Sequence, residues 1–322
     1  MLKLTDAQGR QLAYNDDHED KGSGLNTHHA DSYLTARLPA NETYFIHLGD
    51  IQRKGGPEYA YRLRLSAPQP DFELRVTPSS INLRAGGSAL LTVYALRKDG
   101  FTGEIALTLT NAPAGFLLSG ARILANQNQV RLTLTAPMAS PAEPASLELV
   151  GQATIQGQTV ARVAVPAEDM MQAFAYRHLV PAQELMVDVV GRIQPFAFYW
   201  TTGASPVKIP VGGTGRIELG HPAVAGQIRN LAKNNPAAQG KVTFQLSDPP
   251  EGISLKDTSE GWGRTELVLQ CDAAKVKPGL SGNLIVQVYF ERTPDAANAK
   301  AKGASQSNLV NTLPAIPFVV VP

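Results

Sequence analysis

The sequence predicts an all-β protein built of tandem antiparallel β-sandwiches, and three observations carry this prediction. Short runs in which every second side chain is apolar recur along the whole chain. That period of two is typical of a strand with one face on a core and the other in water. The 28 glycines and 23 prolines stand between these runs as turn signals. Long helical periodicity is nearly absent, which leaves sandwiches as the expected architecture.

The first block comprises residues 1–69. Its predicted strands follow an acidic loop and have the sequences "SYLTARL" (32–38), "TYFIHLGDI" (43–51) and "YAYRLRLS" (59–66). The block ends at "SAPQPDFELRVTP", where Pro68 and Pro70 interrupt the alternation. Proline cannot donate a ladder hydrogen bond or occupy a central strand, so a new sheet is expected to begin after it.

The second block comprises residues 70–166 and the third block residues 167–322. The break between them falls in "VPAEDMMQAFAYRHLVPAQEL". The predicted strands of the second block are 72–76, 81–85, 89–96, 104–110, 130–136, 146–155 and 159–165. Those of the third block are 185–191, 215–219, 241–247, 265–270, 283–291 and 317–322.

The second and third blocks share a spacing that indicates repeats of one unit. Gly103 and Gly115 are twelve residues apart, as are Gly240 and Gly252, and each pair frames a strand and a proline-containing turn. The third block differs by having a longer stretch before this element. An insertion is therefore expected near residues 221–239.

Composition and charge exclude several classes of protein. Apolar residues make up 43% and charged residues 18%, as in an ordinary globular chain. The 29 basic and 28 acidic side chains nearly cancel, so no nucleic-acid partner is predicted. No apolar stretch approaches the roughly 18 residues of a membrane span. The single cysteine, Cys271, is expected to be a small buried side chain.

Motifs that would indicate an enzyme are missing from the sequence. It contains no G-x-S-x-G nucleophile elbow, cysteine-protease signature, H-E-x-x-H, phosphate-binding loop or dinucleotide fingerprint. The prediction is therefore a chain that is not an enzyme.

The loop between Tyr14 and Asp31 concentrates acidic residues and histidines. Calcium takes six to eight oxygen ligands, and Asp16, Asp17, Asp20 and Asp31 offer four carboxylates that would serve a structural Ca²⁺ site. The spacing does not fit an EF-hand loop begun at Asp16, since Lys21 and Thr27 would fall where glycine and the bidentate glutamate belong.

Two other interpretations of this loop remain open at the level of sequence. His18, His28 and His29 offer nitrogen ligands for zinc, although adjacent histidines on an extended chain point to opposite sides. A metal-dependent hydrolase would use such a site. The remaining alternative is a solvated connection between two strands.

Aromatic residues in the third block suggest a ligand-binding surface. In "QPFAFYW" the alternation puts Phe196, Phe198 and Trp200 on one face, which is expected to be core, and Tyr199 on the other. Trp262 lies in the glycine-rich "SEGWGR". Exposed aromatic rings can stack on sugars or hold a peptide, so Trp262 and Tyr199 are the candidate ligand-binding residues.

The first block resembles the bacterial pre-peptidase C-terminal domain, through "LKLTDAQGRQLAYNDD", "ADSYLTARLPANETYFIHLGD" and "GGPEYAYRLRLS" in that order. This resemblance implies a partial jelly-roll-type sandwich, calcium association that maps onto Asp16, Asp17 and Asp31, and attachment to an exported protein. The second and third blocks are similar to bacterial immunoglobulin-like modules, judged by their "GGS" entry, "GEIALTL" and "APAGF".

Members of the pre-peptidase family have several strands before the position of Leu2, usually preceded by a leader, and here Met1 opens almost on a strand. We therefore expect an N-terminally truncated domain. The missing N-terminal region of the same protein would be a binding partner of this block, and the block is expected to be the least stable part of the chain.

The function expected from these features is a non-catalytic accessory, adhesion or scaffolding region of a larger exported bacterial protein. Its location would be secreted, periplasmic or at the cell surface, and its partner an unknown protein or glycan there. The alternative is a carbohydrate-binding module of an exported polysaccharide-degrading system.

Overall fold

The structure is a computed structural model and describes the whole chain except residues 19–23, 27–30, 172–176, 194–196, 223–239 and 293–306. The described residues form strands and connections with no α-helix, and accordingly no helix long and apolar enough to cross a membrane. The chain divides into two compact units: unit 1, residues 1–69 with 168–181, and unit 2, residues 70–167 with 182–322. Unit 2 holds two separate apolar cores, which confirms the prediction of an all-β chain with tandem sandwiches.

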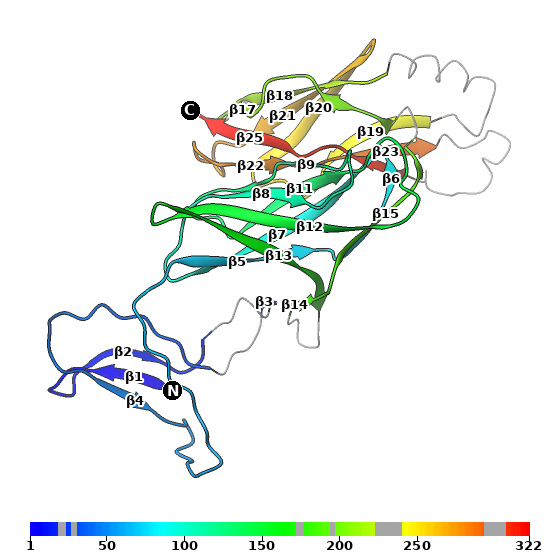
Figure 1. The fold of residues 1–322 in the computed structure, drawn as a ribbon. Coiled ribbons are helices and arrows are strands. Elements are labelled where there is room, and N and C mark those ends of the chain that lie inside the picture. Colours follow the sequence, from blue (N-terminus) through cyan, green and yellow to red (C-terminus); the bar gives the residue numbers. More distant parts are fainter. Residues whose placement is uncertain (19–23, 27–30, 172–176, 194–196, 223–239, 293–306) are drawn as a thin grey trace, which may run out of the picture. The chain divides into compact units, whose positions relative to one another are not determined.

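Unit 1 contains a three-stranded antiparallel sheet in the order β2-β1-β4 (Figure 1). Its strands are β1 (Leu2–Thr5), β2 (Gln11–Asn15) and β4 (Phe45–Leu48). The buried carboxylate of Asp6 closes the turn between β1 and β2 by accepting hydrogen bonds from the backbone N–H groups of Gln8 (3.1 Å) and Arg10 (2.8 Å). A second, short antiparallel pair joins β3 (Gly24–Asn26) to β14 (Arg177–Pro181).

Two of the strands predicted for the first block do not form. Residues 32–38 and 59–66 are extended connections without ladder partners, and β4 covers only part of the predicted strand 43–51. Alternation marks a segment that can form a strand, but a strand needs a neighbour to satisfy its backbone groups. Half of the exposed large hydrophobic side chains in the described part of the chain lie within residues 1–69, Ile46, Leu48 and Leu65 among them.

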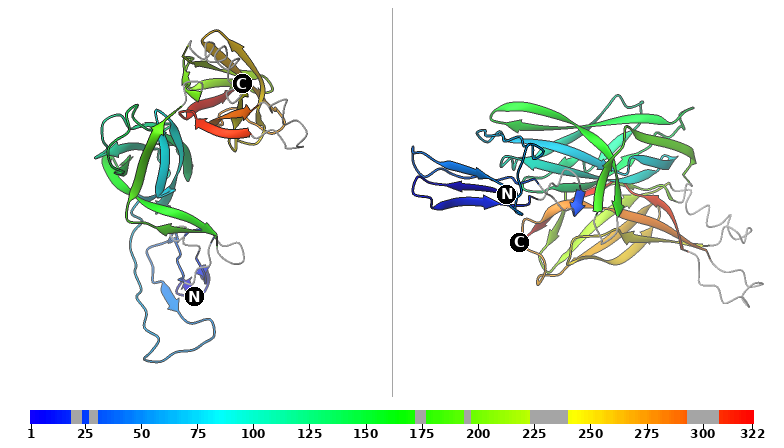
Figure 2. Two further views of the ribbon diagram at one scale, coloured as in Figure 1. Left: turned by 90° about the vertical axis from the view of Figure 1, so that its right-hand side faces the viewer. Right: turned by 90° about the horizontal axis from the view of Figure 1, so that it is seen from below.

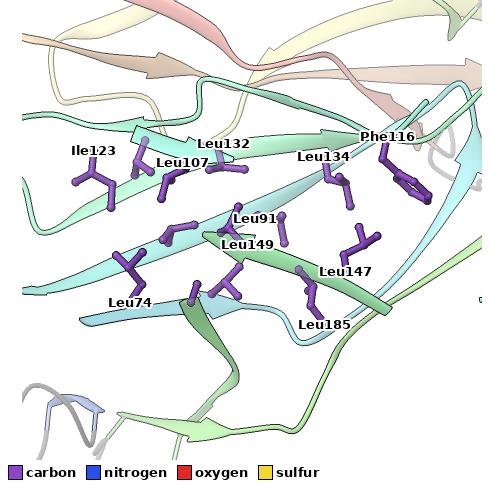
Figure 3. Close-up of a cluster of buried hydrophobic side chains, with 14 of the residues drawn as sticks. Leu74, Leu91, Leu107, Phe116, Ile123, Leu132, Leu134, Leu147, Leu149 and Leu185 are labelled. Carbon is purple, nitrogen blue, oxygen red and sulfur yellow. The ribbon is translucent and has the colours of Figure 1, made fainter. Parts of the chain in front are cut away.

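The first sandwich of unit 2 begins where the proline break predicts a new sheet. Its strands are β5 (Asp71–Thr77), β6 (Ser80–Ala85), β7 (Ser88–Lys98), β8 (Ile105–Thr110), β9 (Leu117–Ser119), β10 (Arg122–Ile123), β11 (Gln129–Thr135), β12 (Ala145–Ile155), β13 (Gln158–Met171) and β15 (Leu185–Arg192). Along β5 the buried side chains Phe72, Leu74 and Val76 alternate with half-buried ones, as the period of two predicts. Figure 3 shows how leucines from several strands converge on this core, Leu74, Leu91 and Leu149 among them.

The strand β13 connects the two layers of this sandwich. Its first half pairs antiparallel with β12, and residues Ala164 to Pro166 then pair parallel with β5. The strand β15, which the sequence places in the third block, pairs with β12 and with β6 and buries Leu185 and Val187 in the first core. Alternation tells which face of a strand is apolar but not which sheet the strand joins, so the sequence could not assign β15 to the first sandwich.

The second sandwich has two sheets of its own and three strands that continue a sheet of the first sandwich, all around its own core. The four-stranded sheet has the order β16-β18-β21-β20, the next has the order β17-β25-β22, and β23 pairs with β19 and β24. The strands are β16 (Trp200–Thr201), β17 (Val207–Pro210), β18 (Thr214–Gly220), β19 (Gly240–Leu246), β20 (Ile253–Gly261), β21 (Arg264–Cys271), β22 (Ser281–Leu284), β23 (Val286–Arg292), β24 (Ser307–Thr312) and β25 (Ile316–Val321). Figure 2 shows the same strands in two further orientations. Cys271 is buried in this core, as predicted, while most of the expected insertion at 221–239 lies outside the described residues.

Hydrogen bonds join the two sandwiches of unit 2. The side-chain amide of Asn283 on β22 donates to the carbonyl oxygens of Gly120 and Arg131, each at 2.8 Å. The guanidinium group of Arg131 on β11 in turn donates to the carbonyl oxygen of Ser247 at 2.6 Å. The backbone N–H of Ala315 donates to the hydroxyl of Thr133 at 2.7 Å in a buried position. Side chains of each sandwich therefore satisfy backbone groups of the other.

Candidate functional site

The acidic loop begins where β2 ends. The side chain of Asn15 organises its first residues: its Nδ2 donates to the carbonyl oxygen of Asp17 at 3.2 Å, and its Oδ1 accepts from the backbone N–H of Tyr33 at 2.9 Å. The hydroxyl of Ser32 donates to the carbonyl oxygen of Asp16. The two ends of the loop are thus held together by polar contacts within the chain.

The predicted metal ligands are only partly described. Asp16 lies 3.7 Å from the ammonium group of Met1, while Asp17 and Asp31 are also placed and Asp20 lies outside the described residues. Within the part of the chain that the structure covers, no three His, Cys, Asp or Glu side chains come together as a metal-binding group. The calcium site stays a prediction.

Of the three histidines considered as zinc ligands, the structure describes one. His18 is exposed and its ring packs against Tyr33, with the ring centroids 4.9 Å apart. His28 and His29 lie outside the described residues.

The aromatic segment before β16 has the opposite orientation to the one expected. Tyr199 is only 7% exposed and belongs to the second core, where its ring meets Phe244 edge to face at 5.1 Å. Trp200, assigned to the core by the alternation, is 43% exposed, and Phe198 is half-buried. Phe196 lies outside the described residues. Tyr199 is therefore not available as a surface platform, because the core of the sandwich takes up its ring.

Trp262 lies at the surface of the second sandwich. Gly261 pairs with Arg264, so Trp262 and Gly263 form the two-residue tip of the β20–β21 hairpin. Gly263 has a positive φ of 70°, a conformation that glycine adopts without strain. With glycines on both sides, the indole of Trp262 is 87% exposed.

Trp200 lies in the same row of residues as this hairpin. Across the four-stranded sheet Trp200 pairs with Gly220, Gly220 with Arg264, and Arg264 with Gly261. Directly paired residues of antiparallel strands face the same side, so this row, called here the tryptophan row, lies on the outer face of the sheet. A Cβ atom at Gly220 would lie 2.6 Å from the Trp200 indole, which shows that the ring lies directly over this glycine.

Charged side chains follow the tryptophan row along the outer face. In the next row Glu218 pairs with Glu266, and Glu266 with Ser259. The guanidinium group of Arg216 lies 3.0 and 3.1 Å from the two carboxylate oxygens of Glu266. Acidic and basic groups alternate here, so the face has hydrogen-bonding groups of both kinds without a strong net charge.

Comparison with known proteins adds little to this picture. No family model matches the chain, and no curated protein matches it. Among solved structures, domains 4 and 5 of the S-layer protein SbsC align at 10% identity over 79% of this chain and all of that one, with a TM-score of 0.20. A marsupial T cell receptor aligns at 8% identity over 78% of this chain and all of that one, with a TM-score of 0.21. Both scores are too low for these similarities to bear on function.

Proposed function

We propose that this chain is a non-catalytic adhesion or scaffolding region of a larger exported bacterial protein. The observation that carries the proposal is the hydrogen-bonded junction between the two sandwiches of unit 2, where Asn283 and Arg131 bind backbone carbonyl groups of the opposite sandwich. Domains that are joined only by a linker move independently as a rule. A junction of this kind instead makes two sandwiches one stiff spacer, which is what a scaffold requires.

The junction is built from contacts that resist bending. Besides Asn283 and Arg131, the side-chain oxygen of Asn311 on β24 accepts from the backbone N–H of Ser88 on β7 at 3.3 Å. Its amide donates at 2.9 Å to the carbonyl oxygen of Ala197, in the segment that links β15 to β16. Ser88 also pairs with Thr312 of β24, so a ladder contact crosses from one sandwich to the other. Tilting one sandwich would break several of these bonds together and leave buried polar groups unpaired, which is costly.

The exported location, the pre-peptidase-like character of residues 1–69 and a structural calcium ion belong to the same proposal. They rest on the resemblance of the first block and on the carboxylates of Asp16, Asp17, Asp20 and Asp31. Calcium would neutralise carboxylates that otherwise repel one another and would fix the loop against the sheet. An extracellular protein or glycan is the expected partner.

A carbohydrate-binding module is the second candidate function. The observation that favours it is the pair of exposed indoles, Trp262 and Trp200, on one sandwich.

Distance measurement between the two sandwiches tests the scaffold proposal. Spin labels are introduced in the full chain at two exposed strand positions, Ala106→Cys on β8 and Ser254→Cys on β20; the buried Cys271 is not expected to react. Double electron–electron resonance should give one narrow distance distribution. In a chain that also carries Arg131→Ala and Asn283→Ala the distribution should broaden.

Arg122→Ala provides the matched control, because its partner Glu104, at 3.2 Å, lies in the same sandwich. Removing that exposed ion pair should leave the distribution narrow. A broad distribution in the parent chain would contradict the proposal, since it would show that the two sandwiches move independently.

A further inference from the structure

We propose that the tryptophan row on the outer face of the second sandwich is a binding surface for a neutral oligosaccharide. Trp200 and Trp262 would stack on sugar rings, while Arg264 and the charged row beside it would bind hydroxyl groups. This inference names the class of ligand that the chain would bind in its adhesion role, and it rests on that proposed function.

Trp200 is held in place and is yet exposed. Its indole lies over Gly220, where a Cβ atom would come within 2.6 Å of the ring, and it packs against Phe198 with the ring centroids 5.8 Å apart. Its remaining surface, 43% of the side chain, faces solvent. A ring that is fixed before binding loses little conformational entropy when a ligand covers it.

Trp200 and the hairpin that carries Trp262 lie at opposite edges of the four-stranded sheet. Trp200 and Gly261 stand three strand spacings apart, about 14 Å, and Trp262 follows Gly261 at the hairpin tip. Gly261 contributes no side chain, and only the carbonyl oxygen of Arg264 lies within 4 Å of the place where its Cβ would be. Between the two tryptophans the row consists of Gly220, Arg264 and Gly261, so Arg264 carries its only side chain there, and the length of the row suits several linked sugars better than one.

The outer face also has polar groups that can bind hydroxyls. Guanidinium and carboxylate groups bind two neighbouring hydroxyls at once, since they present paired donors or paired acceptors. Arg264 lies in the tryptophan row, and Glu218 and Glu266 lie in the row beside it. A pyranose ring has an apolar face and a rim of hydroxyls, so it matches an indole flanked by such groups.

The basic and acidic side chains on the outer face nearly balance, which favours a neutral ligand. On the outer face Arg216 and Arg264 are offset by Glu218, Glu266 and Asp257. A surface for polyanions or for anionic lipid headgroups would need an excess of basic residues. The same balance disfavours insertion of the hairpin tip into an anionic membrane.

Affinity electrophoresis of the full chain tests the proposal. Native gels contain one of the neutral polysaccharides β-glucan, xylan, galactomannan or arabinogalactan, or the anionic polysaccharide alginate. At least one neutral polymer should slow the chain, and alginate should not. Trp200→Ala and Trp262→Ala should each weaken the binding about tenfold or more, as expected when an anchoring aromatic side chain is truncated. Arg264→Ala should also weaken it.

Tyr61→Ala serves as the matched control, because Tyr61 is a 74% exposed aromatic residue in unit 1. Its removal should not change the retardation. Since Trp262 makes up a hairpin tip, its replacement should leave the thermal unfolding of the chain unchanged, so that lost binding reports on the site and not on folding.

Three results would overturn the inference: no retardation by any of the neutral polymers, retardation that survives the loss of both indoles, or binding to phosphatidylserine vesicles that Trp262→Ala abolishes. None of them affects the distance distribution between the sandwiches, so the scaffold proposal would stand or fall separately.

Discussion

The side-chain amide of Asn283 donates a 2.8 Å hydrogen bond to the carbonyl oxygen of Gly120, across the junction between the two sandwiches. Gly120 has a φ of 74°, and a Cβ atom at this position would collide with the Asn283 side chain. Glycine is therefore required at this position for two reasons: the left-handed backbone conformation and the close approach of the Asn283 side chain.

Replacing Gly120 by alanine should disrupt this junction. The left-handed conformation alone costs about 1 kcal/mol for alanine, and displacement of Asn283 would add about 1 to 3 kcal/mol for carbonyl groups left unpaired. The free energy of unfolding in urea measures the total. Gly157→Ala is the control, because Gly157 has a φ of 80° and nothing within 4 Å of its would-be Cβ. Equal losses in the two variants would contradict the role of Asn283.

The reversed orientation of Tyr199 and Trp200 gives a second prediction. Tyr199→Ala should destabilise the chain by about 3 kcal/mol, because it removes a buried ring from the second core. Trp200→Ala should cost less, about 1 kcal/mol, because this side chain is 43% exposed and belongs to neither core. Denaturant unfolding of both variants checks this, and a larger cost for Trp200→Ala would restore the orientation expected from the sequence.

Unit 1 should be the first part of the chain to unfold. Its three-stranded sheet leaves Ile46 and Leu48 exposed, and little burial compensates for the entropy of ordering residues 1–69. Limited proteolysis during a temperature ramp should cut within residues 1–69 before any site in unit 2 is cleaved. Early cleavage in the sandwiches with residues 1–69 intact would rule this prediction out.

Calcium should stabilise unit 1 if the acidic loop binds it. A ligand that binds only the folded state at a hundredfold excess over its dissociation constant adds about 2.7 kcal/mol of stability. The temperature of the unit 1 transition is measured with millimolar calcium, with magnesium and with a chelator, in the parent chain and in the Asp16→Asn, Asp17→Asn double variant. A shift that is specific to calcium and lost in the variant is expected. Absence of a shift in both chains would make the loop a solvated connection.

Asp71 should make the stability of unit 2 depend on pH. Burial opposes ionisation of its carboxyl group, but hydrogen bonds of 2.8 Å from the Arg162 side chain and from the Phe72 backbone N–H outweigh burial and hold its pKa below the ordinary value. The ionised group therefore adds stability above its unfolded-state pKa of about 4. This contribution is lost as the pH falls through the lower, folded-state pKa.

The comparison of the parent chain with Asp71→Asn isolates this effect. The difference between their free energies of unfolding should be largest near pH 7 and should shrink as the pH is lowered below about 4. A difference in the free energy of unfolding that does not change with pH would show that the charge of Asp71 does not stabilise unit 2.

Much of the fold could be predicted from the sequence because strands with one buried face have a clear period. Phe72, Leu74 and Val76 on β5, and Leu267 and Leu269 on β21, are buried as their alternation predicts. Pairing between distant strands has no such local signal. The sequence therefore did not reveal that β15 belongs to the first sandwich, or that residues 32–38 and 59–66 have no ladder partners.

The candidate site was harder to predict. In "QPFAFYW" both faces of the segment are aromatic, and the alternation placed Trp200 in the core and Tyr199 outside, which is wrong; β16 is only two residues long, so the period of two has little to act on. The pairing of Trp200 with Gly220 decides the orientation, because the glycine leaves room for the indole on the outer face. For Trp262 a local signal did exist, since flanking glycines are typical of a hairpin tip.

The parallel strand pairs have a consequence for a protein that works under tension. In the first sandwich β5 pairs parallel with Ala164 to Pro166 of β13, and in the second sandwich β17 pairs parallel with β25. Pulling the two strands of such a pair in opposite directions loads their hydrogen bonds side by side, in shear. The bonds must then break together and not one after another, so the sandwiches would withstand a mechanical load far better than hairpins pulled apart from their open ends.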